Sequence, residues 1–150
     1  MSLRGKLSLI TGSTSGIGLS IAQSLAKAGS NIILNGRQVK LKENVVDISN
    51  YLSSKYNIET YYYGSNLSNL EDIKNLMSFG ESLGGVDILV NNAGIQHVSN
   101  VDDFPVDKWN EIISVHLSAP FHTSRLVLPS MKKKNWGRIV NISSVHGTIA

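Results

Sequence analysis

The stretch Thr11-Gly-Ser-Thr-Ser-Gly-Ile-Gly18 decides how the rest of this chain is interpreted. It lies between a short apolar run at residues 7–10 and a segment whose apolar residues recur at helical spacing. In that context Gly12 would permit a tight turn, Gly16 the close approach of a diphosphate, and Gly18 close packing of helix on strand. The helix N-terminus would then offer unpaired N–H groups to the phosphates. The predicted cofactor-binding residues of this loop are Gly12, Ser13, Thr14, Ser15, Gly16, Ile17 and Gly18. A turn with a purely structural role is the alternative.

Strand-like and helix-like segments alternate along the chain. The expected strands are residues 7–10, 31–35, 58–63, 86–90 and 138–142, and helical spacing follows each of the first four. This alternation predicts βαβ units in a Rossmann-type, doubly wound α/β fold, with a parallel sheet in the order 3-2-1-4-5. Pro120 is expected to bend or interrupt the fourth helical region. Residues 1–150 are expected to form one dinucleotide-binding domain.

Composition excludes several classes of function. With 41% hydrophobic and 17% charged residues, the chain fits a globular protein rather than a disordered one. The absence of cysteine excludes disulfides and thiolate chemistry and favours a cytoplasmic protein. The four histidines lack metal-ligand spacing, so no metal is expected. Lys132-Lys133-Lys134 is expected to be a solvated helix end rather than a nucleic-acid patch. No apolar run is long enough to suggest a targeting or membrane segment.

Three motifs in order resemble the short-chain dehydrogenase/reductase family. They are the glycine loop, Asn91-Asn-Ala-Gly94, and Trp136-Gly-Arg-Ile-Val-Asn-Ile-Ser-Ser-Val-His-Gly147. The resemblance implies that the backbone at Ala93 and Gly94 lets the cofactor ribose pass closely. It also implies that Asn66-Leu67 lies beside the adenine, where the family usually has Asp-Leu. The cofactor-binding residues implied outside the glycine loop are Arg37, Asn66, Leu67, Asn92, Ala93 and Gly94.

The end of the second strand selects the cofactor in dinucleotide-binding folds. A carboxylate there binds the ribose 2′-OH of NAD, whereas an arginine accommodates the 2′-phosphate of NADP. In this chain the position holds Gly36, and Arg37 follows. Arg37 favours NADP, whereas the resemblance over the whole chain favours NAD. Both cofactors stay open, and so does a solvent-facing loop position for Arg37.

The resemblance assigns the catalytic chemistry to Ser144. Its hydroxyl would polarise the substrate oxygen, a tyrosine with a lowered pKa would move the proton, and a lysine would lower that pKa. Neighbouring strand residues face opposite ways, so only one of Ser143 and Ser144 can face the nicotinamide. The family's Tyr-x-x-x-Lys follows the serine, and residues 145–150 hold neither residue. We therefore expect this chain to be inactive by itself, as a truncated form, a non-catalytic remnant or one half of a split enzyme.

Two further positions bear on that assignment. His116 stands where the family usually has an asparagine that supports a proton path, and without the resemblance it would be a partly buried helix residue. Tyr51-x-x-x-Lys55 matches the catalytic motif literally, but it precedes Ser144 in the chain. It is also expected on a helix that covers a face of the sheet, away from the carboxyl ends of the strands. We therefore do not assign it a catalytic role.

The resemblance is strongest to bacterial D-3-hydroxybutyrate dehydrogenases. It is carried by Asn92-Ala-Gly-Ile-Gln-His-Val98, Asp103-Phe-Pro-Val-Asp-Lys-Trp109, Phe121-His-Thr-Ser-Arg125 and Ser144-Val-His-Gly147. It implies that Gln96 and His146 hold the carboxylate of a small hydroxy or keto acid, for which amide and imidazole N–H groups are suitable donors. The alternatives are a surface loop for Gln96 and His97, and a position behind the site for His146. A 3-oxoacyl-carrier-protein reductase is the alternative activity.

The expected partners follow from this assignment. A small-molecule substrate is expected in the complete family member, without nucleic acid or membrane. The fifth strand is expected to form an open edge, which favours self-association or a complementing C-terminal chain. The tetramer common in the family is not expected here.

Overall fold

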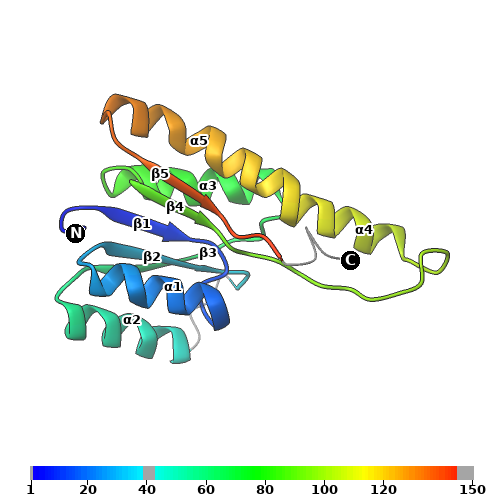
Figure 1. The fold of residues 1–150 in the computed structure, drawn as a ribbon, viewed down its shortest axis with the longest axis horizontal. Coiled ribbons are helices and arrows are strands. Elements are labelled where there is room, and N and C mark those ends of the chain that lie inside the picture. The colour runs from blue at the N-terminus through cyan, green and yellow to red at the C-terminus, as the bar shows by residue number, and fades with distance from the viewer. Residues whose placement is uncertain (1, 39–42, 145–150) are drawn as a thin grey trace.

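A computed structural model describes residues 2–38 and 43–144. Figure 1 shows strands and helices alternating along the chain. In order they are β1 (Leu7–Ile10), α1 (Gly16–Lys27), β2 (Asn31–Gly36), α2 (Glu43–Tyr56), β3 (Thr60–Gly64), α3 (Leu70–Ser82), β4 (Ile88–Asn91), α4 (Val106–Ile113), the π-helical turn η1 (Ser114–Ser118), α5 (Ala119–Lys133) and β5 (Arg138–Asn141).

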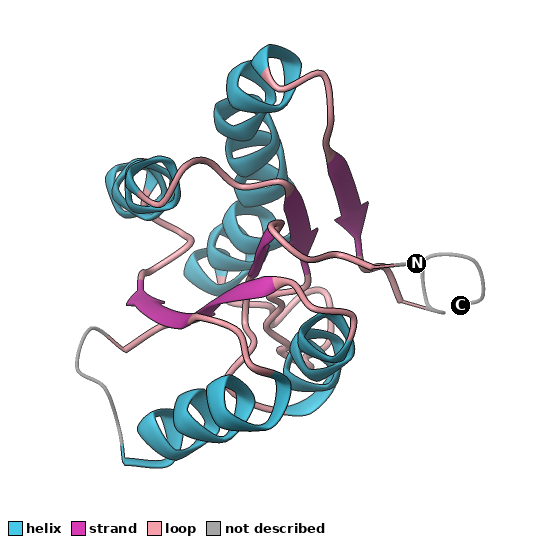
Figure 2. Cartoon of the chain, turned by 90° about the vertical axis from the view of Figure 1, so that its left-hand side faces the viewer, coloured by secondary structure: helices cyan, strands magenta, loops and turns pink. Residues whose placement is uncertain are grey.

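The five strands form one parallel sheet in the order β3-β2-β1-β4-β5, which confirms the predicted fold and strand order. The helices cover both faces: α1 and α2 lie on one, and α3 and α5 on the other (Figures 1 and 2). Since every crossover passes over a face of the sheet, the carboxyl ends of all strands meet at one edge.

Both faces of the central strands are buried, as expected for a parallel sheet between helices. Leu9, Ile33 and Leu89 pack with α3 and α5 on one side. Ile10 and Ile32 pack with α1 and α2 on the other. Because successive side chains of a strand point to opposite faces, each strand contributes to two apolar layers, and these layers hold the strand ends in place.

The long helical region after β4 is not interrupted at Pro120. It continues from α4 through η1 into α5, and Pro120 lies in the first turn of α5. Proline has no N–H to donate within a helix. The widened turn just before it, in which the N–H of Ala119 donates to the carbonyl of Ser114, absorbs the irregularity. Pro129 also lies inside α5.

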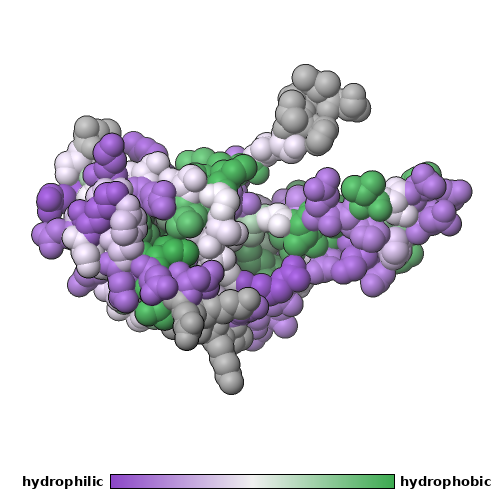
Figure 3. All heavy atoms as spheres, turned by 90° about the horizontal axis from the view of Figure 1, so that it is seen from below, coloured by the Kyte–Doolittle hydropathy of each residue, from purple (hydrophilic) through white to green (hydrophobic). Residues whose placement is uncertain are grey.

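The segment from α4 to β5 is more exposed than the rest. Helix α4 and the loop that joins it to β4 extend beyond the sheet (Figure 1). Seen from below, this extension carries both hydrophilic and hydrophobic residues on its surface (Figure 3). Within the described residues β5 pairs only with β4, and Val140 is 44% exposed. None of the described helices is long and apolar enough to cross a membrane.

Candidate dinucleotide-binding site

The carboxyl ends of the strands surround a cavity of about 370 Å³. It lies where the chain reverses direction across the sheet, because β1 pairs with β2 on one side and with β4 on the other. In open α/β sheets this crevice is where ligands bind. The lining residues are Gly12, Thr14, Ser15, Ile17, Gly18, Asn35, Gly36, Arg37, Ser65, Asn66, Leu67, Asn92, Ala93, Gly94, Ile95 and Val115. The predicted cofactor residues are thus brought together, except Ser13 and Gly16, which do not line the cavity.

The glycine loop fits against the backbone after β4. Gly12 has a φ of +63°, and a Cβ there would lie 3.0 Å from Cα of Ala93. A Cβ at Gly18 would collide with the carbonyl oxygen of Gly12 and lie 2.5 Å from Nδ2 of Asn92. Any side chain at Gly12 or Gly18 would therefore push the two loops apart. A Cβ at Gly16 would meet nothing within 4 Å, so this turn leaves room for a ligand.

Asn35 is one of the residues of this site that sequence reasoning missed, with Ser65, Ile95 and Val115. It is 1% exposed at the end of β2, and its Nδ2 donates to the carbonyl of Tyr63 at 2.8 Å and to Oγ of Ser65 at 2.9 Å. The N–H of Asn35 donates to Oγ of Ser13 at 2.9 Å, and the N–H of Ser13 donates back to the carbonyl of Asn35 at 2.8 Å. Asn35 thus joins the glycine loop to the end of β3. An amide at the end of an otherwise apolar strand was the available signal.

Thr11 and Asn92 join the glycine loop to β4. Oγ1 of Thr11 accepts the N–H groups of Asn92 and Ala93 at 2.9 and 3.0 Å. Nδ2 of Asn92 donates to the carbonyls of Thr11 and Gly12 at 2.9 and 3.2 Å. The two walls of the cavity are therefore fixed before any ligand arrives, which lowers the entropy cost of binding.

The end of β2 cannot readily carry a carboxylate. A Cβ at Gly36 would lie 3.0 Å from Cγ2 of Thr14 and 3.2 Å from Oη of Tyr62. The hydroxyl of Tyr62 in turn donates to the carbonyl of Gln38 at 2.6 Å, so this wall is fixed. Arg37 therefore provides the charged group on this side of the cavity.

Asn66 is exposed at the end of β3. Its Oδ1 accepts the N–H of Ser68 at 3.1 Å, and its own N–H donates to Oδ2 of Asp72 at 2.9 Å. Leu67 beside it is 9% exposed and packs into the core. The pair thus presents a polar residue and an apolar wall to the cavity.

A second cavity, of about 440 Å³, lies between η1, α5 and the end of β5. Its lining includes Asn91, His116, Asn141 and Ser143. Nδ2 of Asn91 donates to Oδ1 of Asn141 at 2.8 Å, which aligns the two strand ends. Ser143 rather than Ser144 lines this cavity, and Ser144 is exposed, so its catalytic role stays a prediction. His146 lies outside the described residues.

His116 contacts the loop that follows Asn91-Asn-Ala-Gly94. Its Nε2 lies 2.9 Å from both the N–H and the carbonyl oxygen of Ile95, so one tautomer accepts and the other donates. A Cβ at Gly94 would lie 3.3 Å from the imidazole ring. His116 is exposed rather than partly buried, because the widened η1 turn directs it across the end of the sheet.

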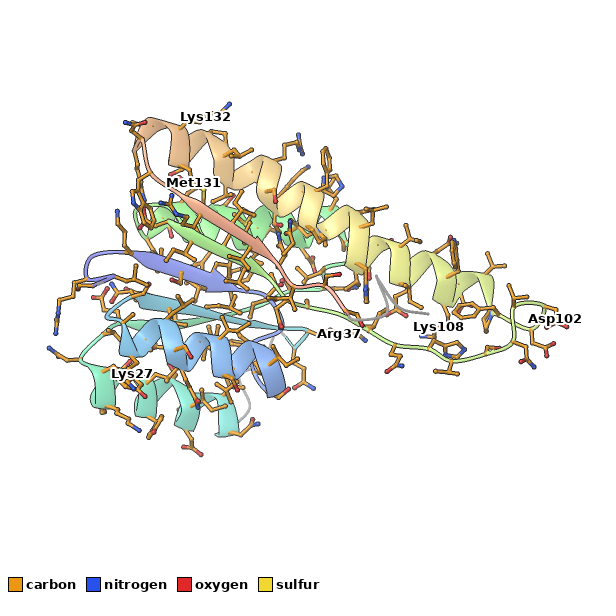
Figure 4. All side chains as sticks on the ribbon, viewed as in Figure 1. Lys27, Arg37, Asp102, Lys108, Met131 and Lys132 are labelled. Carbon is orange, nitrogen blue, oxygen red and sulfur yellow. The ribbon has the colours of Figure 1, made fainter. Side chains whose placement is uncertain are left out.

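Gln96 lines a third cavity, of about 290 Å³, with Arg37, His97, Lys108 and Glu111. Gln96 thus lines a different cavity from Ser143. Figure 4 labels Arg37 at the carboxyl edge of the sheet and Lys108 on α4. Between their side chains lies the carboxylate of Glu111, which makes an ion pair with each.

The remaining titratable groups have other roles. Tyr51 and Lys55 are hydrogen-bonded to each other on α2 and line none of these cavities. This hydrogen bond raises the pKa of Lys55. Lys134 is not only a solvated helix end: its Nζ lies 3.0 Å from Oδ1 of Asp87 and donates to the carbonyl of Gly85 at 2.7 Å. Among the described residues no three acidic or histidine side chains form a possible metal cluster.

Known proteins share both the sequence and the geometry of this chain. Residues 6–150 match the model of the short chain dehydrogenase family. A D-beta-hydroxybutyrate dehydrogenase from Cupriavidus necator is 47% identical over 99% of this chain and 56% of its own length. The 3-oxoacyl-[acyl-carrier-protein] reductase FabG from Aquifex aeolicus is 40% identical over 97% of this chain and 58% of its own length.

A solved structure agrees with these relatives. The L-sorbose reductase from Gluconobacter frateurii, complexed with NADPH and L-sorbose, has a TM-score of 0.90 and 30% identity, covering 98% of this chain and 55% of its own. The chain thus spans about half the length of the relatives that it matches. Since the family model matches residues 6–150, this chain belongs to the short chain dehydrogenase family.

Proposed function

We propose that these residues form the dinucleotide-binding part of an NAD(P)-dependent oxidoreductase that interconverts 3-hydroxybutyrate and acetoacetate. The observation that supports dinucleotide binding is the cavity at the strand ends, where the glycine loop packs closely against Ala93. The first N–H groups of α1 have no intrahelical acceptor, and Ile17 and Gly18 of this turn line the cavity, where a diphosphate would accept them. The similarity to a D-beta-hydroxybutyrate dehydrogenase supports the substrate half.

In this proposal the bound nicotinamide supplies the hydride, and this chain's residues hold the reactants. Ser144 orients the oxygen of the keto group, and Gln96 and His146 hold the carboxylate. The donors on Gln96 and His146 match a short acid better than an acyl thioester. A 3-oxoacyl-[acyl-carrier-protein] reductase is the second candidate, favoured by the 40% identity to the Aquifex aeolicus protein.

Cofactor binding is tested by calorimetry of this chain with NADH and NADPH. Ser15 precedes α1 as its N-cap and lines the cavity, and both Asn and Asp serve well at an N-cap. Ser15→Asn and Ser15→Asp are therefore a matched pair that differs mainly in charge. We expect Ser15→Asp to bind both dinucleotides roughly tenfold more weakly than Ser15→Asn, since a carboxylate would face the diphosphate. Equal binding by the two variants would contradict a diphosphate at this loop.

Turnover is tested on the product of the entire reading frame that contains these residues. NAD(P)H oxidation is followed with acetoacetate and, separately, with an acetoacetyl thioester. Turnover of acetoacetate, together with a higher KM for acetoacetate in a Gln96→Leu variant, would support the assignment. Turnover of the thioester alone would replace it with the reductase.

A further inference from the structure

Arg37 faces two cavities at once. It follows β2 in the wall of the dinucleotide cavity, and it also lines the neighbouring cavity under α4. Its Nη2 lies 3.4 Å from Oε1 of Glu111, with the two side chains 62% and 26% exposed. The residue expected to meet the cofactor's 2′ position is therefore in contact with a carboxylate from an element 74 residues away in sequence.

Glu111 is shared between two cations. Its Oε2 lies 2.9 Å from Nζ of Lys108, one turn earlier on α4. The hydrogen bond from Lys108 lowers the pKa of Glu111, so the carboxylate is ionised at neutral pH. Arg37 thus faces a full negative charge, which Lys108 partly compensates.

The end of β2 leaves little room for a carboxylate of its own. Dinucleotide folds that prefer NAD carry an acidic residue at the end of the second strand. Here a side chain at Gly36 would press on Thr14 and Tyr62, so the strand itself has little room for one. Glu111 brings a negative charge to the same edge of the sheet from α4 instead.

We infer that Glu111 is a specificity-determining residue of the dinucleotide site, which competes with the 2′-phosphate of NADP(H) for Arg37. This inference rests on the proposed function. A guanidinium binds carboxylate and phosphate with the same donors, so the phosphate has to displace Glu111 and then approach its charge. The 2′-hydroxyl of NAD(H) does neither. Glu111 therefore lowers the ratio of NADP(H) affinity to NAD(H) affinity that Arg37 alone would give.

The test measures affinities for NADPH and NADH, and for 2′,5′-ADP and 5′-AMP as probes of the adenosine half. Glu111→Gln keeps the shape of the side chain and removes its charge. We expect it to tighten NADPH and 2′,5′-ADP roughly two- to fivefold, the range of an exposed ion pair, and to leave NADH and AMP unchanged. Raising the salt concentration should shrink this gain. Glu81→Gln, near the C-terminal end of α3, makes the same change in net charge outside the cavities and should alter nothing.

Lys108→Met should have the opposite effect. Without Lys108, Glu111 pairs with Arg37 alone, and a cation near the expected position of the phosphate is lost. NADPH should therefore bind more weakly, while NADH binding is unaffected. In an Arg37→Gln background the gain from Glu111→Gln should largely disappear, because the two residues act through one interaction.

The outcomes separate the inference from the proposed function. If the wild-type chain binds neither dinucleotide, the proposed function fails and the inference falls with it. If both bind and Glu111→Gln shifts NADPH and NADH equally, or shifts neither, dinucleotide binding stands and the role of Glu111 is overturned. Opposite signs for Glu111→Gln and Lys108→Met, confined to the phosphorylated ligands, would establish it.

Discussion

Two regions of this molecule differ in how many of their polar groups are hydrogen-bonded and how much of their apolar surface is buried. We call the carboxyl ends of β1, β2 and β4 the nucleotide edge, and α4, η1, α5 and β5 the outer layer. At the nucleotide edge Thr11, Ser13 and Asn35 are at most 2% exposed, and each is hydrogen-bonded to a neighbouring loop or strand. In the outer layer Leu117 and Phe121 are more than 60% exposed.

This difference shows where stability and function come from in these residues. A buried and fully bonded polar network fixes one geometry, which is what a preorganised ligand site needs. The exposed apolar side chains of the outer layer each forgo about 1.5–3 kcal/mol that burial would contribute. Contacts within these residues therefore determine the dinucleotide cavity, whereas the outer layer has apolar surface left to bury.

The largest expected effect separates the sheet core from the outer layer with one residue type. Leu9→Ala in β1, where the side chain is 0% exposed, should cost about 2–5 kcal/mol of unfolding free energy because it leaves a cavity. Leu117→Ala, at a side chain 66% exposed, should change the stability by less than about 0.5 kcal/mol. Urea unfolding followed by circular dichroism measures both. Comparable losses would show that Leu117 is buried in solution.

The next effect tests the polar network at the nucleotide edge. Asn35→Leu keeps a similar volume but leaves the carbonyl of Tyr63 and the hydroxyl of Ser65 without this donor. We expect a loss of about 2–4 kcal/mol, together with weaker dinucleotide binding, because the glycine loop loses its tie to β3. Asn31→Leu removes the half-buried amide at the other end of β2, which bonds Glu59 rather than the glycine loop, and serves as the control for binding. Unchanged binding in a folded Asn35→Leu variant would mean that the loop holds its shape without Asn35.

How much of this could be predicted from the sequence depends on the range of the interaction. The strands and the glycine loop could be predicted, because apolar alternation and the glycine spacing are local patterns. The remaining predicted lining, Asn66, Leu67 and Asn92 to Gly94, came from the resemblance to the family. Asn35 escaped because one buried amide has no periodicity. Glu111 escaped because its contact with Arg37 depends on where α4 crosses the end of the sheet. The exposure of His116 depends on the η1 turn, which no short motif specifies.

A smaller effect tests how firmly the outer layer is attached to the sheet. Lys134 ends α5, and its ion pair with Asp87, 6% exposed, connects that helix to the start of β4. Oδ2 of Asp87 also accepts the N–H of Leu7 at 2.9 Å. Lys134→Met should cost about 1 kcal/mol, more than a typical surface pair but less than a fully buried one, since Lys134 remains 31% exposed. Lys132→Met, two residues earlier and exposed, is the control and should be neutral. Equal stability of the two variants would restore the prediction of a uniformly solvated basic run.

The smallest expected effect concerns the Tyr51–Lys55 pair on α2, which carries the family's catalytic residue types outside both regions. Tyr51→Phe removes the hydroxyl that bonds Lys55 on a side chain already 48% exposed. Because neither residue lines the dinucleotide cavity, the affinities for NADH and NADPH should stay within about twofold of the unchanged chain. Lys55 should also return toward its ordinary pKa, because the hydrogen bond that Lys55 donates to Tyr51 is the largest cause of its rise. A titration of the lysine side chain by NMR measures that change in the same sample. A loss of dinucleotide affinity in Tyr51→Phe would mean that α2 is energetically coupled to the nucleotide edge, which would then have to be defined to include α2.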